Sequence, residues 1–259
     1  MIAPSKLCLT DTVYYRHSCD RLPRSPVPPS FDAATALLWE PQSVPRRGPR
    51  PGLTLDAVAR AGVEIADADG LAAVTMQRVA ASLGVTKMAL YRYVPGKDEL
   101  VALMVDRAVG EPPELDGDWR PRLRGWAHAL FERFWHHPWA IAATVGARPV
   151  GPNEVGWLDV AVTALDGTGL RGAEMLDVAV TLTGHVRGIA QQAASARHPE
   201  EALASTLAAL VAGRRDRMPV LAAALESVAD DERDNALDFG LDRILDGVAL
   251  LITSRTRPE

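Results

Sequence analysis

The chain has 259 residues, of which 47% are hydrophobic and 24% are charged, a composition that suits a globular protein with a buried core. Its formal net charge is −5, so the overall charge gives no sign of nucleic-acid binding. Cys8 and Cys19 supply neither a disulfide framework nor a metal-ligand set. No stretch approaches the ~20 apolar residues of a membrane span. We therefore expect a cytoplasmic protein with no metal, no cofactor and no membrane partner.

Residues 1–45 are predicted to form a largely disordered extension. Nine of the 19 prolines lie in residues 1–51, and four of them crowd into residues 23–29, where no regular helix can persist. Residues 31–39 could form one or two helical turns, but the sequence offers no packing partner for them. Three arginines in residues 46–50 suit either an arm that contacts DNA or a solubilising linker.

The charge changes sign locally after the extension. Residues 46–97 hold eight basic residues against four acidic ones, a local charge of +4 on an acidic chain. Such a basic patch is the electrostatic signature of a DNA-binding module, although a solvated charged face would have the same composition. A first helix is predicted over residues 54–69, where Thr54 is a suitable N-cap and Gly70 a suitable end.

Residues 75–97 have the pattern of a helix-turn-helix. Two short amphipathic segments flank Gly84, which supplies the backbone freedom of a tight turn. Thr86 is a suitable N-cap for the second helix, which would bury Ala89 and Leu90. Its outward face then carries Lys87, Met88, Tyr91 and Arg92. An ordinary helical hairpin is the alternative, but an outward face with two cations and a phenol favours a helix that enters the DNA major groove.

The remainder of the chain reads as helices without strands. A fourth helix follows Lys97, and the acidic, proline-containing residues 110–118 form a predicted linker. Further helices are predicted over residues 119–136, 153–166, 172–196, 199–212 and 231–254, with a short one from Pro219. Residues 139–147 are a short, nearly all-apolar segment that is predicted to be buried. The predicted fold is all-α, with a three-helix DNA-binding domain over residues 46–110 and a helical ligand-binding and dimerisation domain over residues 119–256.

Enzyme signatures are absent from the sequence. It contains no His-Glu-x-x-His, phosphate loop, Gly-x-Ser-x-Gly or Gly-x-Gly-x-x-Gly motif. His136 and His137 are adjacent and would point about 100° apart on a helix, which makes them a poor metal pair. An all-α enzyme is therefore the less favoured alternative to a DNA-binding protein.

The predicted DNA-binding domain, here called the head, resembles the tetracycline-repressor (TetR) family of bacterial transcriptional regulators. The matching residues are Val74-Thr75, Val79-Ala80, Leu83-Gly84-Val85, Ala89-Leu90-Tyr91 and Lys97. The C-terminal part resembles the tetracycline-repressor branch, through Gly146-Ala147-Arg148-Pro149, residues 165–170, Gly184-His185-Val186-Arg187-Gly188 and residues 239–247. The resemblance implies a homodimer that reads a palindromic double-stranded DNA operator and leaves it when a small-molecule effector binds. A constitutive DNA-binding dimer without a ligand switch is the nearer alternative.

The resemblance also implies roles for individual residues in the head. Gln77 and Lys87 match positions that touch bases, and both side chains can bond base edges in the major groove. Thr75, Tyr91, Tyr93 and Lys97 match phosphate contacts, which fix register without reading sequence. The complete predicted DNA-binding set is Thr75, Gln77, Arg78, Thr86, Lys87, Met88, Ala89, Tyr91, Arg92, Tyr93 and Lys97.

Effector-binding candidates are polar groups and aromatic rings on otherwise buried helices. The predicted set is Trp139, Thr144, Arg148, Pro149, Asn153, Trp157, His185 and Gln191, with Trp135, His137 and Gln192 as further candidates. For some of these a structural role is the competing interpretation. Trp135 and Trp139 suit a core, Asn153 suits a helix cap, and His185 suits a hydrogen-bonded core histidine.

The resemblance places the dimer interface on the helices over residues 172–196 and 231–254, two from each chain, as a four-helix bundle. The apolar stripe of the last helix is Leu237, Leu241, Ile244, Leu245, Val248 and Leu251. A stripe used only within the core of one chain is the open alternative.

We predict that the effector acts without a divalent metal. In the tetracycline repressor a histidine just before the Gly-x-Arg-Pro segment helps to bind the magnesium that accompanies the drug, and the matching residue here is Thr144. A hydroxyl is a poor substitute for imidazole as a metal ligand. Effector-induced release of operator DNA should therefore be the same with EDTA as with Mg²⁺, and a requirement for Mg²⁺ would contradict the prediction.

Overall fold

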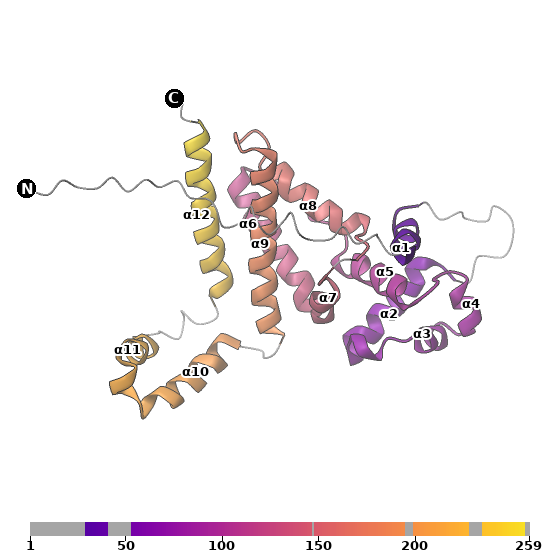
Figure 1. Ribbon diagram of the computed structural model, residues 1–259, viewed down its shortest axis with the longest axis horizontal. Helices are drawn as coiled ribbons and strands as arrows, with labels where there is room; N and C mark the ends of the chain where they lie inside the picture. Colours follow the sequence, from indigo (N-terminus) through magenta and orange to yellow (C-terminus); the bar gives the residue numbers. More distant parts are fainter. Residues whose placement is uncertain (1–28, 41–52, 147, 195–198, 228–234, 257–259) are drawn as a thin grey trace, which may run out of the picture.

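The computed structural model describes residues 29–40, 53–146, 148–194, 199–227 and 235–256, and within these ranges the chain is helical (Figure 1). The helices are α1 (Pro29–Trp39), α2 (Leu55–Asp69), α3 (Met76–Ser82), α4 (Lys87–Tyr91), α5 (Lys97–Val109), α6 (Trp119–His136), α7 (Pro138–Ala143), α8 (Pro152–Ala164), α9 (Gly172–Ala193), α10 (Pro199–Ala212), α11 (Pro219–Ser227) and α12 (Ala236–Thr256). Two short 3₁₀ turns, Leu71–Ala73 and Arg215–Arg217, join neighbouring helices. The all-α prediction is confirmed over these ranges.

The N-terminal head consists of α2 to α5, and three threonines set where its first helices begin. Thr54, Thr75 and Thr86 each accept a hydrogen bond from the backbone N–H three residues later, so they cap α2, α3 and α4. The caps at Thr54 and Thr86 were predicted. The turn between α3 and α4 passes through Gly84 at φ +66°, a left-handed conformation that favours glycine. Leu90 then anchors α4 with no exposed surface.

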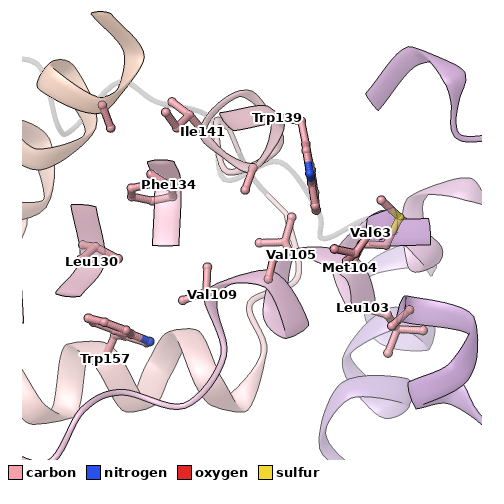
Figure 2. Packing of buried hydrophobic residues seen from close by; sticks show 14 of the residues in the cluster. Val63, Leu103, Met104, Val105, Val109, Leu130, Phe134, Trp139, Ile141 and Trp157 are labelled. Carbon is pink, nitrogen blue, oxygen red and sulfur yellow. The ribbon is translucent and has the colours of Figure 1, made fainter. Parts of the chain in front are cut away.

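Helix α5 packs against both halves of the chain. It contacts α2 in the head and also α6, α7 and α8 in the C-terminal body, which consists of α6 to α12. Figure 2 shows Val105 and Val109 of α5 facing the aromatic residues of the body, while Leu103 and Met104 lie toward Val63 of α2. The seven apolar residues of α5 that are buried are Leu100, Ala102, Leu103, Met104, Val105, Ala108 and Val109. A helix that is apolar on nearly every side must be covered on every side, so head and body share one hydrophobic core.

In the body, α6, α8 and α9 pack on one another, and α12 covers α9 and α6 (Figure 1). Charged side chains along α6 and α12 line up one turn apart. Arg124 donates to Asp238 at 2.5 Å and also pairs with Asp242, and Arg120 bonds Asp246 at 2.6 Å. His128 Nε2 lies 3.0 Å from Asp238. These contacts fix the antiparallel register of α12 against α6, and each is partly exposed, so each contributes modestly to stability.

Helices α10 and α11 form a hairpin that extends beyond the foot of α9 (Figure 1). Their main packing is against each other, through Val211 and Ala222. Several large apolar side chains of the hairpin remain exposed, namely Leu203, Leu210, Met218, Val220 and Leu221. The hairpin therefore carries apolar surface that the described parts of the chain leave uncovered.

The expectation of a disordered extension over residues 1–45 is wrong for residues 29–39, which form α1. This helix packs on α5 through its buried Ala34 and the half-buried Leu37 and Leu38, a partner that the local sequence does not reveal. Residues 46–50, with the expected arginine arm, lie outside the described residues. None of the described helices is long and apolar enough to cross a membrane.

Candidate nucleic-acid interface and effector pocket

The outer face of α4 is the candidate nucleic-acid interface. The helix has only five residues, and Leu90 alone is buried, so the short segment is held by its cap and one apolar anchor. Met88 is 75% exposed, and Lys87, Tyr91 and Arg92 are also exposed. The Lys87 ammonium lies 5.6 Å from the centre of the Tyr91 ring, a cation–π contact that orients both groups on the same face. The face thus offers two cations, a phenol and a flexible apolar side chain to solvent.

The other predicted DNA-binding residues fall into two groups. Gln77, Tyr93 and Lys97 are exposed, as a DNA contact requires. The remaining residues have local structural roles, since Thr75 and Thr86 cap helices and Ala89 is half-buried. Arg78 forms an ion pair with Asp69, so a DNA phosphate would have to compete with a carboxylate for it. Arg78 is therefore the member of the set whose charge is least available.

The body has a partly open cavity of about 140 Å³ between α5, α6, α8 and α9. Its walls are Val109, Trp126, Leu130, Phe134, Thr144, Arg148, Glu154, Trp157, Leu158, Thr183 and Arg187. Two tryptophans form one side, with ring centres 6.0 Å apart in an edge-to-face arrangement. The Trp126 indole donates to the Trp157 carbonyl at 2.8 Å, and the Trp157 indole donates to the Gly110 carbonyl at 2.9 Å. These bonds hold both rings in fixed orientations.

Charged groups line the opposite side of the cavity. Arg148 forms a two-point ion pair with Glu154, in which the Nη1–Oε1 distance is 2.8 Å. Arg187 donates to the Ile141 carbonyl at 3.0 Å and to the Thr144 carbonyl at 3.4 Å. Burial lowers the pKa of Arg187, and the nearby positive charge of Arg148 lowers it further. Two arginines and one glutamate thus leave a net charge of one positive unit beside the aromatic rings, which suits a ligand with negatively polarised oxygens.

Three of the eight predicted effector residues line this cavity: Thr144, Arg148 and Trp157. Pro149 is adjacent to it, and the Pro149 carbonyl accepts a hydrogen bond from Arg148. Gln191 is exposed on α9. The structure thus brings only part of the predicted set together, near the start of α8, and effector binding there stays a prediction.

The structure gives the other candidates structural contacts. The Trp139 indole donates to Asp67 at 2.7 Å, and His137 Nδ1 lies 2.8 Å from the same carboxylate oxygen. His185 Nε2 lies 2.9 Å from the Leu237 carbonyl, and its ring fills the space beside Gly240, so it packs α9 on α12. The further candidate Trp135 stacks on Phe131 and is 41% exposed, and Gln192 is exposed on α9.

Asn153 is not the helix cap that the sequence suggested. The N-cap of α8 is Gly151, which has no side chain to accept the first amides of the helix. The Asp106 carboxylate of α5 accepts them instead. One Asp106 carboxylate oxygen accepts the backbone N–H of Asn153 at 2.9 Å and of Glu154 at 3.2 Å. The Asn153 side chain donates in return to the Asp106 carbonyl at 3.0 Å. A Cβ at Gly151 would overlap the Asp106 carboxylate, which explains the glycine.

Sequence reasoning missed most of the cavity walls. Trp126, Leu130 and Phe134 lie on the buried stripe of α6, and nothing in a helical period distinguishes a core residue from one that borders a cavity. Glu154, Thr183 and Arg187 come from different parts of the chain, and only the tertiary structure shows that they share the cavity. Of these three, Arg187 alone carried a signal, because it lies in the segment 184–188 that resembles the tetracycline-repressor branch.

Two comparisons place the fold in a class of known proteins. Residues 55–104 match the profile described as "Bacterial regulatory proteins, tetR family". Residues 111–252 match the profile described as "Tetracyclin repressor-like, C-terminal domain". Over the described residues no group of three or more His, Cys, Asp or Glu side chains could hold a metal ion.

Relatives and solved structures agree with these profiles. The chain is 36% identical over 235 residues to the HTH-type transcriptional repressor DrrR1 of Streptomyces coeruleorubidus, covering 85% of this chain and 86% of that protein. An HTH-type transcriptional regulator of Saccharopolyspora erythraea is 31% identical over 198 residues, covering 74% of this chain and 83% of that one. ActR of Streptomyces coelicolor in complex with actinorhodin superposes with a TM-score of 0.66 at 25% identity, covering 76% of this chain and 95% of that chain.

The chain is therefore a helix-turn-helix transcriptional regulator and not an enzyme. It belongs to the TetR family, with a tetracycline-repressor-like C-terminal domain, as the sequence motifs predicted.

Substitution of Asp106 should separate its capping role from its charge. Asp106→Ala leaves two helix-start amides without an acceptor and should lower the free energy of unfolding by about 1–2 kcal/mol. Asp106→Asn keeps an acceptor oxygen and should stay close to wild type at pH 7. Urea unfolding of the three proteins provides the measurement.

The pH dependence provides a second readout of the same contact. Burial raises the pKa of Asp106 above its ordinary 3.8, although the two amides that it accepts oppose the shift. The folded state then binds the proton more tightly than the unfolded state, so the Asp106 contribution to stability falls as pH rises from about 4 through the raised pKa. Asp106→Asn should lose this dependence. An Asn variant as unstable as the Ala variant would show that the carboxylate charge itself is required.

Proposed function

We propose that the protein is a homodimeric repressor whose heads bind the two halves of a palindromic operator, and that a small-molecule effector releases it from DNA. The observation that carries the proposal is the five-residue α4, capped by Thr86 and anchored by Leu90, with every other functional group of the helix turned to solvent. In a TetR-family head this is the face available to the major groove.

Base reading and phosphate contact are divided among the exposed residues. Gln77 and Lys87 are proposed to bond base edges, with Met88 beside a thymine methyl. Tyr91, Tyr93 and Lys97 are proposed to bond phosphates, and Arg92 can serve either role. Thr75 and Thr86 lie at the starts of α3 and α4, and these helix starts are proposed to face the DNA backbone. The N-terminal amides of a helix favour an anion such as a DNA phosphate. Arg78 and Ala89 contribute least, because one is paired with Asp69 and the other is half-buried.

The outer surfaces of α9 and α12 support the dimer proposal. Leu176 and Val180 are 46% and 67% exposed one turn apart on α9, and Phe239 and Leu250 are 62% and 74% exposed on α12. Such apolar groups in a row favour a partner helix pair, as in a four-helix bundle. This stripe differs from the expected one, because Leu241, Leu245 and Val248 are buried in the core of their own chain.

The α10–α11 hairpin gives the dimer proposal a second support. It leaves the body at the foot of α9, and its uncovered apolar residues would be exposed in a monomer. A second copy docked along α9 and α12 offers the nearest surface on which the hairpin could bury them. The dimer is thus proposed to cover both apolar surfaces.

The cavity beside Arg148 is the proposed effector site. ActR, a structural relative, has been solved in complex with actinorhodin and with (S)-DNPA, so that protein binds small molecules. In this chain two tryptophans, Phe134 and the arginines favour an aromatic molecule that carries oxygen acceptors. Drug-sized ligands need roughly 300–1,000 Å³, so the cavity of about 140 Å³ must widen when such an effector enters.

Widening the cavity would move the start of α8. The side chains of Arg148 and Glu154 form an ion pair in the cavity wall. The backbone N–H of Glu154 also donates a hydrogen bond to the Asp106 carboxylate of α5. An effector that draws Arg148 away from Glu154 would shift α8 against α5, and α5 carries the head. A rise in melting temperature with a panel of aromatic metabolites would support the ligand switch, whereas a constitutive DNA-binding dimer would show none.

Lysine substitutions should distinguish a base contact from a phosphate contact. Lys97→Ala should weaken binding to all DNA sequences alike and reduce the slope of log affinity against log salt by about one, because one fewer counterion is released. Lys87→Ala should cost about 1–3 kcal/mol on the selected operator and relax preference at one position of each half-site. Fluorescence anisotropy on operators selected from random DNA gives both quantities. Selection of sequences without a palindrome would contradict the proposed dimeric repressor.

A charge on the proposed dimer surface should break the assembly. Val180→Lys places an ammonium in the apolar row of α9, so the protein should become monomeric at micromolar concentration and lose operator affinity by more than tenfold. Val155→Lys is a matched control, since Val155 is an exposed valine on α8 outside the proposed surface. Analytical ultracentrifugation reports the mass of each variant. A dimeric Val180→Lys variant would place the interface elsewhere.

A further inference from the structure

Helix α1 lies outside the head and the body and contacts both. Ala34 is only 2% exposed, and Leu37 and Leu38 pack against the shared core from the same side of the helix. Their partner is α5, the helix that joins head and body. Figure 1 shows α1 against the head, next to α5 and α2. The helix thus rests on the head side of the junction.

The C-terminal residue of α1 reaches the body. The Trp39 indole donates a hydrogen bond to the Val150 carbonyl at 2.9 Å. Val150 immediately precedes Gly151, the N-cap of α8, and the following amides bond Asp106 of α5. Two separate contacts therefore hold the start of α8 to the head side: the carboxylate of Asp106 and the indole of Trp39.

An open cleft lies beside α1 where the head meets the body. It has a volume of about 660 Å³ and is lined by residues of α1, α2 and α5 together with Arg133, His137 and Asn153 of the body. Side chains that border an open cleft lack packing partners on that side, so apolar packing restrains the start of α8 less there than in the shared core. The specific contacts made across this edge therefore add to the restraint that the shared core supplies.

We propose that α1 is an intramolecular clasp that restrains the start of α8 relative to the head. Docking of Ala34, Leu37 and Leu38 fixes α1 on α5, and Trp39 transfers that restraint to Val150. Undocking α1 would free the loop that carries Arg148 and so make α8 easier to displace. The restraint itself does not depend on an effector; its consequence for operator release rests on the proposed function.

The experiment compares amide hydrogen exchange in the full-length protein and three variants, without DNA or effector. Ala34→Asp puts a charge into the buried contact and should undock α1. Trp39→Phe removes only the indole donor. Ala173→Asp places the same charge on an exposed first turn of α9 and is the matched control.

We expect Ala34→Asp to speed exchange of the amides in residues 153–156 by roughly three- to tenfold, the factor for losing about one hydrogen bond. Trp39→Phe should give at least half of that effect on a logarithmic scale, and Ala173→Asp none. Exchange in the middle of α9 should stay the same in all variants.

Equal exchange at residues 153–156 in wild type and in Trp39→Phe would overturn the clasp, as would an equal rise in Ala173→Asp. If Ala34→Asp unfolds the chain, Trp39→Phe still decides, because it leaves the α1–α5 contact intact. Operator binding is measured separately on the same proteins. Failure of the wild type to bind a palindrome would refute the proposed repressor while leaving the exchange comparison valid.

Discussion

The structure depends on the burial of α5 from two sides. Its apolar residues face α2 on one side and α6, α7 and α8 on the other, so neither head nor body has a complete core without it. Gly62 of α2 allows an especially close approach, since a Cβ there would lie 2.6 Å from Met104 Sδ. A helix shared in this way cannot shift in the body without shifting the head. The packing of one helix therefore couples the body to the head, as the proposed ligand switch requires.

Hydrogen bonds between polar groups connect particular segments of the body to particular residues of the head. Asp106 is the buried carboxylate that meets the start of α8, and Asp67 of α2 bonds both His137 and Trp139 at the α6–α7 corner. Unlike apolar packing, hydrogen bonds are lost within a fraction of an ångström, so these contacts tie particular segments of the body to particular points of the head. The start of α8 also carries Glu154, the ion-pair partner of Arg148. Specific polar contacts thus connect the pocket to the head in addition to the shared apolar core.

The DNA-binding half of the protein could be predicted largely from sequence because its determinants are local. Caps at Thr54, Thr75 and Thr86, a glycine in the turn and the apolar period of α3 all act within a few residues. The pocket could not be predicted in this way. Trp126 and Trp157 are far apart in the chain, and in the sequence they look like any core residues. The polar side chains of His185 and Asn153 form hydrogen bonds between helices and do not line the cavity.

The sequence by itself determined the helix boundaries of the head, the exposed face of α4 and membership of a family of regulators, because each follows from short-range pattern. Only the tertiary structure decided which polar side chains share a cavity, that Asp106 caps a helix 47 residues away, and that residues 29–39 have a partner. Those outcomes depend on which helix faces meet, and the packing of several helices at once sets that geometry.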